Sequence, residues 1–227
     1  MQLIIGNKNY SSWSMRPWVL LKSFGIPFEE RRLRFDFAPD SAFYQALAVY
    51  TPTAKVPVLV EDDGFAVWDT LAITEHIAER HPALAIWPRD ARSRSRARSL
   101  CAEMHAGFAT LRNLCPMNIE AALPEIGAKH LAENAQLRAD LARIDTIWRE
   151  QLAASGGPFL FGDFGAIDAY FAPVVMRIKS YALPLSEASA AYAQRVQAAP
   201  GVRDWIAEAL AEQDFLDFEE PYRSARG

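Results

Sequence analysis

Residues 2–24 read QLIIGNKNYSSWSMRPWVLLKSF and combine a short apolar run, a polar break and a helical repeat. The run at 2–5 has the length and composition of a buried strand, and the break at 11–14 holds three serines. Apolar residues up to position 24 then recur at helical spacing, and Gly25 and Pro27 follow as typical helix-ending residues. The stretch therefore predicts a strand, a polar turn and a helix over 15–24.

The rest of the first 82 residues continues this alternation. Strands are predicted at 28–33, 56–60 and 65–68, with a weak helix at 40–47 and a stronger helix at 71–80. Asp63-Gly64 lies between the last two apolar runs and favours a hairpin. The order βαβ-α-ββα predicts an α/β domain in which helices cover a small mixed sheet.

The sequence changes character near residue 82, after which it is rich in alanine and helix-periodic. Residues 1–82 are predicted to form the first domain, 83–90 a linker that contains Pro88, and 91–227 an all-helical domain. Helices are expected at about 91–114, 129–153, 167–181, 186–198 and 201–212. The length fits one large domain or two modest ones, since a domain commonly has about 100–150 residues.

Charge and composition exclude several classes of partner. The formal net charge is −4, so no overall basic field attracts nucleic acid or an anionic membrane. No run approaches the roughly 18–20 apolar residues of a membrane span, and the N-terminus does not resemble a secretory signal. Two cysteines do not make the disulfide framework of a secreted domain, so a cytoplasmic location is expected. Five arginines at 89–98 predict a solvated helix start or a dimer contact.

The serines at 11–14 lie where a helix is expected to begin. Backbone N–H groups at a helix start carry partial positive charge and stabilise a thiolate or a carboxylate. Thioredoxins and glutaredoxins have Cys-x-x-Cys at this point of a βαβ unit, whereas this chain has Ser11-Ser12-Trp13-Ser14. The chain therefore has no local dithiol for disulfide exchange, but a serine hydroxyl can donate to a thiolate that a ligand brings. The alternative is that a serine merely caps the helix.

Two further motifs offer backbone and polar groups to a ligand. Pro57 stands at the edge of a strand, and a cis Val56–Pro57 bond would turn the Val56 N–H and C=O outward to pair with a peptide-like ligand. The alternative is an ordinary turn proline. Asp69 and Thr70 stand where a strand gives way to a helix and can bind an ammonium and a carboxylate group, or can act only as a helix cap.

Together, in this order and spacing, these three motifs resemble the glutathione transferase family, and the serine pattern is similar to its serine classes, in particular zeta-like and related bacterial members. The resemblance covers the whole chain and implies a thioredoxin-like domain followed by an all-helical domain. It implies glutathione as co-substrate, no metal and a homodimer. Carried over by position, Ser11 would face the glutathione sulfur, with Ser12 the less favoured alternative.

The resemblance also implies how the rest of glutathione is held. Val56 and Pro57 would contact the cysteinyl part, Lys55 would lie near the glycyl carboxylate, and Asp69 and Thr70 would hold the γ-glutamyl end. The family usually has Glu or Gln followed by Ser at these last two positions. The shorter Asp69 changes the reach by one methylene group and keeps the same hydrogen-bonding chemistry.

The second half supplies a structural segment and the expected electrophile pocket. Gly165 stands where the family has a capping Ser or Thr, and Asp168 is expected to bond back to the backbone at 165–166 in a structural role. The predicted substrate-binding residues are Met104, His105, Phe108 and Arg112, with Leu111, Cys115, Met117 and Asn118 as further candidates. Met104, Phe108 and Leu111 have helical spacing, so core packing is the alternative for some of them. No His or Cys cluster has metal-ligand spacing.

Three functions are consistent with these observations. The first is a transferase in which Ser11 activates the glutathione thiolate for attack on a hydrophobic or anionic electrophile. The second is a glutathione-dependent cis–trans isomerase, in which glutathione adds to the substrate, lets a bond rotate and leaves. The third is a non-catalytic protein that binds glutathione or carries another ligand.

Overall fold

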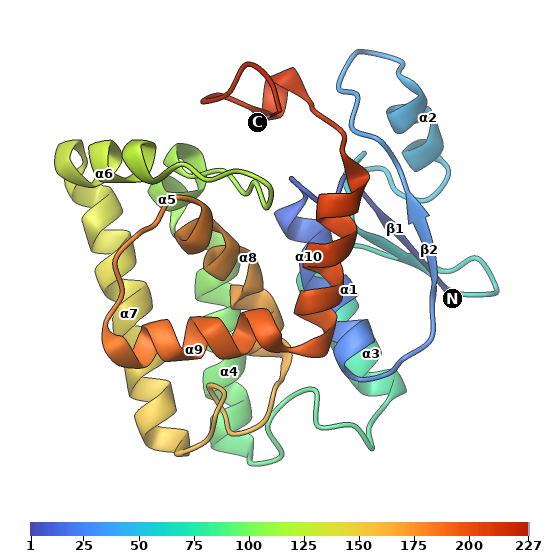
Figure 1. Cartoon of the computed structure of the whole chain (residues 1–227). Helices are drawn as coiled ribbons and strands as arrows, with labels where there is room; N and C mark the ends of the chain where they lie inside the picture. The colour runs from blue at the N-terminus through green and yellow to red at the C-terminus, as the bar shows by residue number, and fades with distance from the viewer. Residues whose placement is uncertain (227) are drawn as a thin grey trace.

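The structure is a computed structural model that describes residues 1–226 of the chain. Its N-terminal part contains a four-stranded sheet in the order β2-β1-β3-β4 (Figure 1). Strand β1 (Gln2–Ile5) is parallel to β2 (Glu29–Arg32) and antiparallel to β3 (Val58–Val60), and β3 is antiparallel to β4 (Ala66–Val67). The predicted mixed sheet and its hairpin are confirmed.

Alternating side chains of the strands enter two separate cores. Leu3 and Ile5 pack in the main core with residues of α1 (Ser12–Ser23) and α3 (Thr70–Arg80), while Ile4 packs in a smaller core with residues of α2 (Ala42–Ala48). This division follows from strand geometry, because successive side chains of a strand point to opposite faces of the sheet. All four residues of β2 are exposed, and their charges protect the edge of the sheet.

The second half is helical, as predicted, but it contains more helices than the periodicity indicated. The helices are α4 (Ala91–Ala106), α5 (Ala109–Leu114), α6 (Pro124–Glu133), α7 (Ala135–Ser155), α8 (Ala166–Ser180), α9 (Glu187–Ala198) and α10 (Pro200–Glu212). A short 3-10 helix, η1 (Asp217–Glu219), follows. Gly227, the last residue of the predicted helical domain, lies outside the described residues. The predicted fold class is confirmed.

Two predicted helix boundaries were wrong. The helix predicted at 91–114 ends at Ala106, because Phe108 has a left-handed backbone with φ of 56° and α5 begins only after it, at Ala109. The helix predicted at 129–153 is interrupted at Asn134, whose side chain accepts a hydrogen bond from the Leu137 N–H and caps α7. A local backbone conformation or cap therefore overrides the continuous periodicity in both places.

Helix α1 joins the two halves of the molecule. It lies beside α10 and packs against both α8 and α10 (Figure 1). At Gly201 of α10 an added Cβ would lie 2.6 Å from the Val19 carbonyl oxygen, so only glycine allows this approach. After α10 the chain returns to the first half, where Tyr10 bonds to Asp214 and Glu220. The start of α1 is therefore held from several sides.

Within residues 1–226, no helix is both long and apolar enough to cross a lipid bilayer.

Candidate functional site

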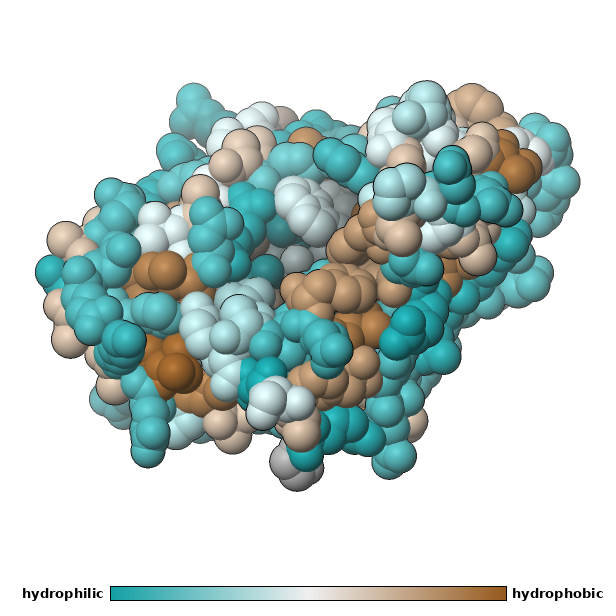
Figure 2. All heavy atoms as spheres, turned by 90° about the horizontal axis from the view of Figure 1, so that it is seen from above, coloured by the Kyte–Doolittle hydropathy of each residue, from teal (hydrophilic) through white to brown (hydrophobic). Residues whose placement is uncertain are grey.

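A cleft of about 1050 Å³ lies where the two halves meet, and all seven predicted glutathione-binding residues border it. Ser11, Ser12, Val56 and Asp69 border it from the first half, and Arg177 is among the residues that border it from the second. Seen from above, the surface of the molecule is hollowed near its centre, between hydrophobic and hydrophilic residues (Figure 2). Three sequence motifs far apart in the chain thus converge on one cavity.

Ser11 is the N-cap residue of α1, and its hydroxyl is already engaged. Its Oγ accepts from the Ser14 N–H at 3.4 Å and donates to the Ser14 Oγ at 2.7 Å. Ser14 in turn accepts from the Gly6 N–H. The capping interpretation of this serine is therefore present in the structure. Its predicted contact with a sulfur stays a prediction.

Ser12 is the first residue of α1 and has a different partner. The Arg177 guanidinium donates from Nη2 to the Ser12 Oγ at 3.3 Å, and both residues border the cleft. Ser12 is also close to the positive end of α1, which favours a negative charge nearby. Sequence reasoning missed Arg177. The available signal was a cation near the end of the largely apolar run 166–178.

Arg16 adds a second buried cation near this point. It is 1% exposed, and its guanidinium carbon lies 4.2 Å from the Trp13 ring centroid and 5.1 Å from that of Tyr170. Burial lowers the pKa of Arg16 to about 10 and that of Arg177 to about 9, so both remain charged at neutral pH. Two buried positive charges therefore lie close to the start of α1: Arg177 borders the cleft, and Arg16 lies against Trp13, which also borders it.

The backbone at Val56 is available to a ligand. The Val56–Pro57 bond is cis, the first of the two alternatives considered for this proline. Among the described residues, no backbone hydrogen bond uses the Val56 N–H or C=O. Lys55 is exposed at the border of the same cleft. This is the arrangement expected for pairing with a peptide-like molecule and its carboxylate.

Asp69 and Thr70 differ in how much they can offer a ligand. Asp69 caps α3, with Oδ1 accepting from the Leu71 N–H at 2.8 Å, and its Oδ2 lies 3.4 Å from the His105 Nε2. The Thr70 side chain is buried and its Oγ1 accepts from the Tyr170 hydroxyl at 3.3 Å. Asp69 thus uses one carboxylate oxygen as a cap and has the other near His105, which also borders the cleft, while the Thr70 hydroxyl is buried against Tyr170.

Of the four predicted substrate-binding residues, His105 alone is among those that border the cleft. Met104 and Phe108 are buried in the main core, which agrees with the core-packing alternative. Arg112 donates to the carbonyl oxygens of Met104, His105 and Gly107, so it neutralises the end of α4. Burial, and then the charges of Arg16 and Arg112, lower the pKa of His105 against the opposing effect of Asp69.

Of the further candidates, Met117 borders the cleft, whereas Leu111 and Cys115 are buried in the main core. Asn118 is buried and donates to Glu220.

Sequence reasoning also missed an aromatic wall of the cleft. Its members are Tyr10, Trp13, Phe35, Phe37, Phe43, Tyr44 and Trp68, and the carboxylate of Glu219 lies nearby on η1. These aromatic residues lie in four separate segments, so no single sequence motif predicts them. They give the cleft an apolar side that suits a hydrophobic electrophile.

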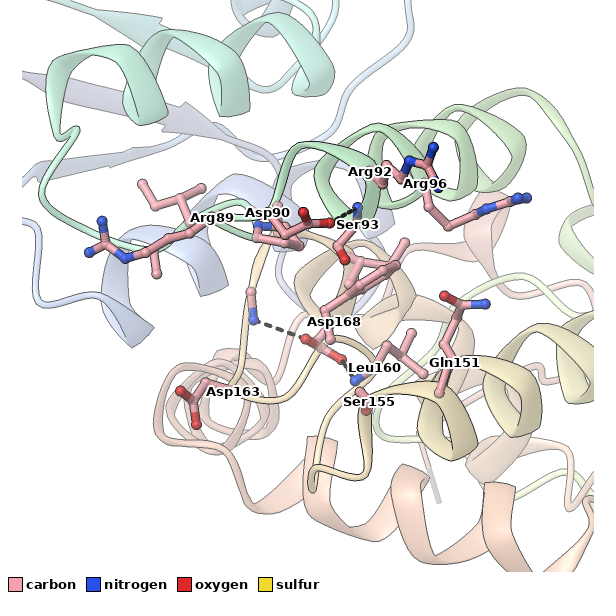
Figure 3. A pocket seen from close by; sticks show the side chains of 18 residues that line it. Arg89, Asp90, Arg92, Ser93, Arg96, Gln151, Ser155, Leu160, Asp163 and Asp168 are labelled. Carbon is pink, nitrogen blue, oxygen red and sulfur yellow. Dashed lines mark hydrogen bonds between the residues drawn. The ribbon is translucent and has the colours of Figure 1, made fainter.

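A second cavity, of about 640 Å³, lies beneath the linker and has a structural carboxylate at its border (Figure 3). Asp168 accepts the predicted bond from the Gly165 N–H at 2.9 Å, and also bonds from the Leu160 N–H and the Tyr192 hydroxyl. Burial raises the pKa of Asp168 to about 6, against the effect of these bonds. Because the Asp168 carboxylate already accepts these three hydrogen bonds, we assign the ligand site to the larger cleft.

In the described part of the chain, no group of three or more His, Cys, Asp or Glu residues could hold a metal ion.

Comparisons with known proteins place these features in a family. Two family models match the chain: the glutathione S-transferase N-terminal domain at residues 10–80 and the C-terminal domain at residues 119–208. A probable maleylacetoacetate isomerase from Caenorhabditis elegans is 31% identical over 103 residues, which are 45% of this chain and 45% of that protein. The chain thus matches less than half the length of that relative.

A second relative and a solved structure extend over more of the chain. The maleylacetoacetate isomerase of Rattus norvegicus is 25% identical over 176 residues, which are 77% of this chain and 76% of that protein. A glutathione transferase homolog from Burkholderia gl BGR1, solved with bound glutathione, is 24% identical with a TM-score of 0.65 and covers 92% of this chain and 98% of that chain. At this identity, the structural similarity supports the fold alone.

Proposed function

Because the chain belongs to the glutathione S-transferase family, we propose that it is a transferase that binds glutathione in the interdomain cleft and activates its thiol with a hydroxyl of the Ser11–Ser12 pair. The observation that carries the proposal is the meeting of three ligand-binding features in one cavity. These are the serine hydroxyls at the start of α1, the unpaired backbone of Val56 and the carboxylate of Asp69.

The chemistry of glutathione explains why these groups are useful together. A free thiol has a pKa of about 8.5, so only a few per cent is thiolate at neutral pH. A hydroxyl donor and a helix N-terminus both favour the anion and increase the nucleophile available for attack. Val56 would fix the cysteinyl unit, Lys55 the glycyl carboxylate, and Asp69 the ammonium group of the γ-glutamyl unit. The aromatic wall would hold the electrophile.

A glutathione-dependent cis–trans isomerase is the second candidate. It is favoured by the names of two relatives, a probable maleylacetoacetate isomerase and a maleylacetoacetate isomerase. In that reaction glutathione adds to the substrate and is released again, so the same thiolate site would serve both functions. A cytoplasmic location and a homodimer stay expectations from the sequence and the family resemblance.

The experiment is to incubate the full chain with glutathione and a panel of halogenated, α,β-unsaturated and cis-olefinic electrophiles. Loss of free glutathione with formation of a conjugate would support a transferase. Conversion of a cis to a trans substrate with glutathione regenerated would favour the isomerase. Calorimetry measures glutathione binding in parallel, and saturable binding with no turnover would favour a binding protein. Absence of saturable binding would overturn the proposal.

A further inference from the structure

Arg177 is a buried cation in the last turn of α8. Met176 and Ile178 on either side of it are apolar and also buried. The guanidinium donates through Nη2 to the Ser12 Oγ at 3.3 Å and through Nη1 to the Pro173 carbonyl oxygen at 3.4 Å, while Nε has no partner among the described residues. It reaches the cleft at the point where Ser12 begins α1.

The surroundings of this guanidinium do not balance its charge. The charged and titratable groups that act on it are Arg16 of α1, Arg112 of α5, Cys115 and Tyr181. Two of these are cations, and the other two are neutral at physiological pH because burial raises the pKa of Cys115 to about 12 and that of Tyr181 above its usual range. Within residues 1–226, Arg177 forms no ion pair with a carboxylate. A buried cation normally has an anionic partner, since burying an uncompensated charge is costly.

The two serines differ in whether their hydroxyl proton is free. The Ser11 proton is donated to the Ser14 Oγ, and the Ser11 oxygen caps the helix. The Ser12 oxygen accepts from Arg177, and within the described residues its proton is donated to no acceptor. An oxygen that accepts from a cation becomes a stronger donor through its own proton. Ser12 is therefore the serine that is ready to donate into the cleft.

We propose that Arg177 is a positioning residue that holds Ser12 as the hydrogen-bond donor to the glutathione thiolate, and that this thiolate is the anion that balances the buried guanidinium. The inference rests on the proposed function and deepens it, because it selects Ser12 over Ser11. No covalent bond forms with the chain. The thiol proton leaves to water, the sulfur keeps the electron pair, and the Ser12 O–H and the Arg177 cation stabilise the negative charge.

A carboxylate of the second substrate has the same charge and could occupy the same place. The two candidate anions differ in one respect: the thiolate exists only when glutathione carries a free thiol. S-methylglutathione retains the tripeptide and cannot ionise at sulfur, so it is the matched probe. If Arg177 serves the thiolate, its removal changes the ionisation of bound glutathione. If Arg177 serves a substrate carboxylate, its removal raises the KM of carboxylated electrophiles and leaves that ionisation unchanged.

The test uses the full chain and the variants Arg177→Met, Arg177→Lys, Ser12→Ala and Ser11→Ala. Lys179→Met is the matched control, since Lys179 is an exposed cation on the same helix and does not border the cleft. The ultraviolet absorbance of the thiolate is followed against pH in saturating glutathione, and the affinity for S-methylglutathione is measured by calorimetry. Circular dichroism confirms that each variant is folded.

In the unmodified chain and in Lys179→Met, we expect bound glutathione to ionise below the pKa of about 8.5 of a free thiol. Arg177→Met should raise this pKa by about one unit, which lowers the thiolate at neutral pH about tenfold. Arg177→Lys should recover part of the shift, and Ser12→Ala should give the same rise. Arg177→Met combined with Ser12→Ala should add little further, because the two residues act as one unit. S-methylglutathione should bind all of them with similar affinity.

Different failures have different meanings. An unchanged thiol pKa in Arg177→Met, together with normal binding of S-methylglutathione, overturns the inference and leaves the proposed function standing. A rise of the thiol pKa in Ser11→Ala but not in Ser12→Ala also overturns the inference. Failure of the unmodified chain to bind either tripeptide overturns both the proposed function and the inference. If Arg177→Met does not fold, Arg177→Lys and Ser12→Ala decide the question by the same readout.

Discussion

Replacing Glu220 with glutamine should strongly destabilise the protein, because this buried carboxylate ties the returning C-terminal segment to both halves. Its oxygens accept from the Tyr10 hydroxyl at 2.7 Å, from the Asn118 amide at 2.9 Å and from the Arg223 guanidinium at 2.5 and 2.8 Å. Tyr10 directly precedes Ser11, so the same carboxylate helps to fix the start of α1.

The size of the effect follows from the number of partners. A hydrogen bond to a charged group contributes about 1.5–3 kcal/mol and a neutral one about 0.5–1.5 kcal/mol, so neutralising Glu220 should cost about 3 kcal/mol over its three partners. Since 1 kcal/mol shifts the Tm of a protein of this size by roughly 2–4 °C, the Tm should fall by roughly 6–12 °C.

The pH dependence has a defined sign. Burial acts to raise the pKa of Glu220, but the bonds from Arg223, Tyr10 and Asn118 outweigh it and hold the pKa below the ordinary value. The stabilisation is therefore present above the unfolded pKa of about 4.3 and is lost as the pH falls through the lower folded value. The free energy of unfolding of Glu220→Gln should differ from the unmodified chain at pH 7 and converge with it in acid.

The neighbouring Glu219 supplies a matched control for this experiment. Burial, and then the charge of Glu220, raise the pKa of Glu219, so its ionised form is disfavoured in the folded state. Glu219→Gln should leave the urea midpoint unchanged or raise it, whereas Glu220→Gln should lower it. Equal midpoints for the two variants, or a loss below about 1 kcal/mol for Glu220→Gln, would refute the reasoning.

Three further substitutions test how the site is supported. Gly201→Ala should lower the free energy of unfolding in urea by about 1–3 kcal/mol, because its Cβ would lie 2.6 Å from the Val19 carbonyl oxygen; an unchanged urea midpoint would contradict this close packing. Ser11→Ala should cost about 1 kcal/mol of thermal stability through the lost helix cap and Ser11→Gly only a few tenths, so equal losses would argue against capping. Asp168→Ala should cost about 3 kcal/mol in a denaturant titration, since the Gly165 and Leu160 amides and the Tyr192 hydroxyl lose their acceptor; a neutral result would contradict its structural role.

The sequence predicted the first half of the fold well because its signals are local. The apolar run at 2–5, the Asp63-Gly64 hairpin and the Val56–Pro57 strand edge each depend on neighbouring residues alone, and the structure contains all three. The helix boundaries in the second half were less accurate. The break at Phe108 is a left-handed residue next to Gly107, and α6 begins at Pro124, ahead of the helix predicted from residue 129.

The residues of the candidate site that belong to a local motif could be predicted from the sequence. Those whose position depends on packing between distant segments could not. Ser12, Val56 and Asp69 lie in recognisable motifs, and the structure brings them to one cleft. Met104 has helical spacing that suits a pocket and a core equally, and only the packing of α4 places it in the core. The contact of Arg177 with Ser12 joins residues 165 positions apart, which no local pattern reveals.

The most direct test of the central claim is an ultraviolet titration of glutathione bound to the unmodified full chain. The serine end of the cleft combines a hydroxyl, a helix N-terminus and two buried cations, so we predict that bound glutathione ionises about one to two units below the pKa of about 8.5 of a free thiol. Saturable binding with an unshifted thiol pKa would contradict the claim that this cleft activates glutathione.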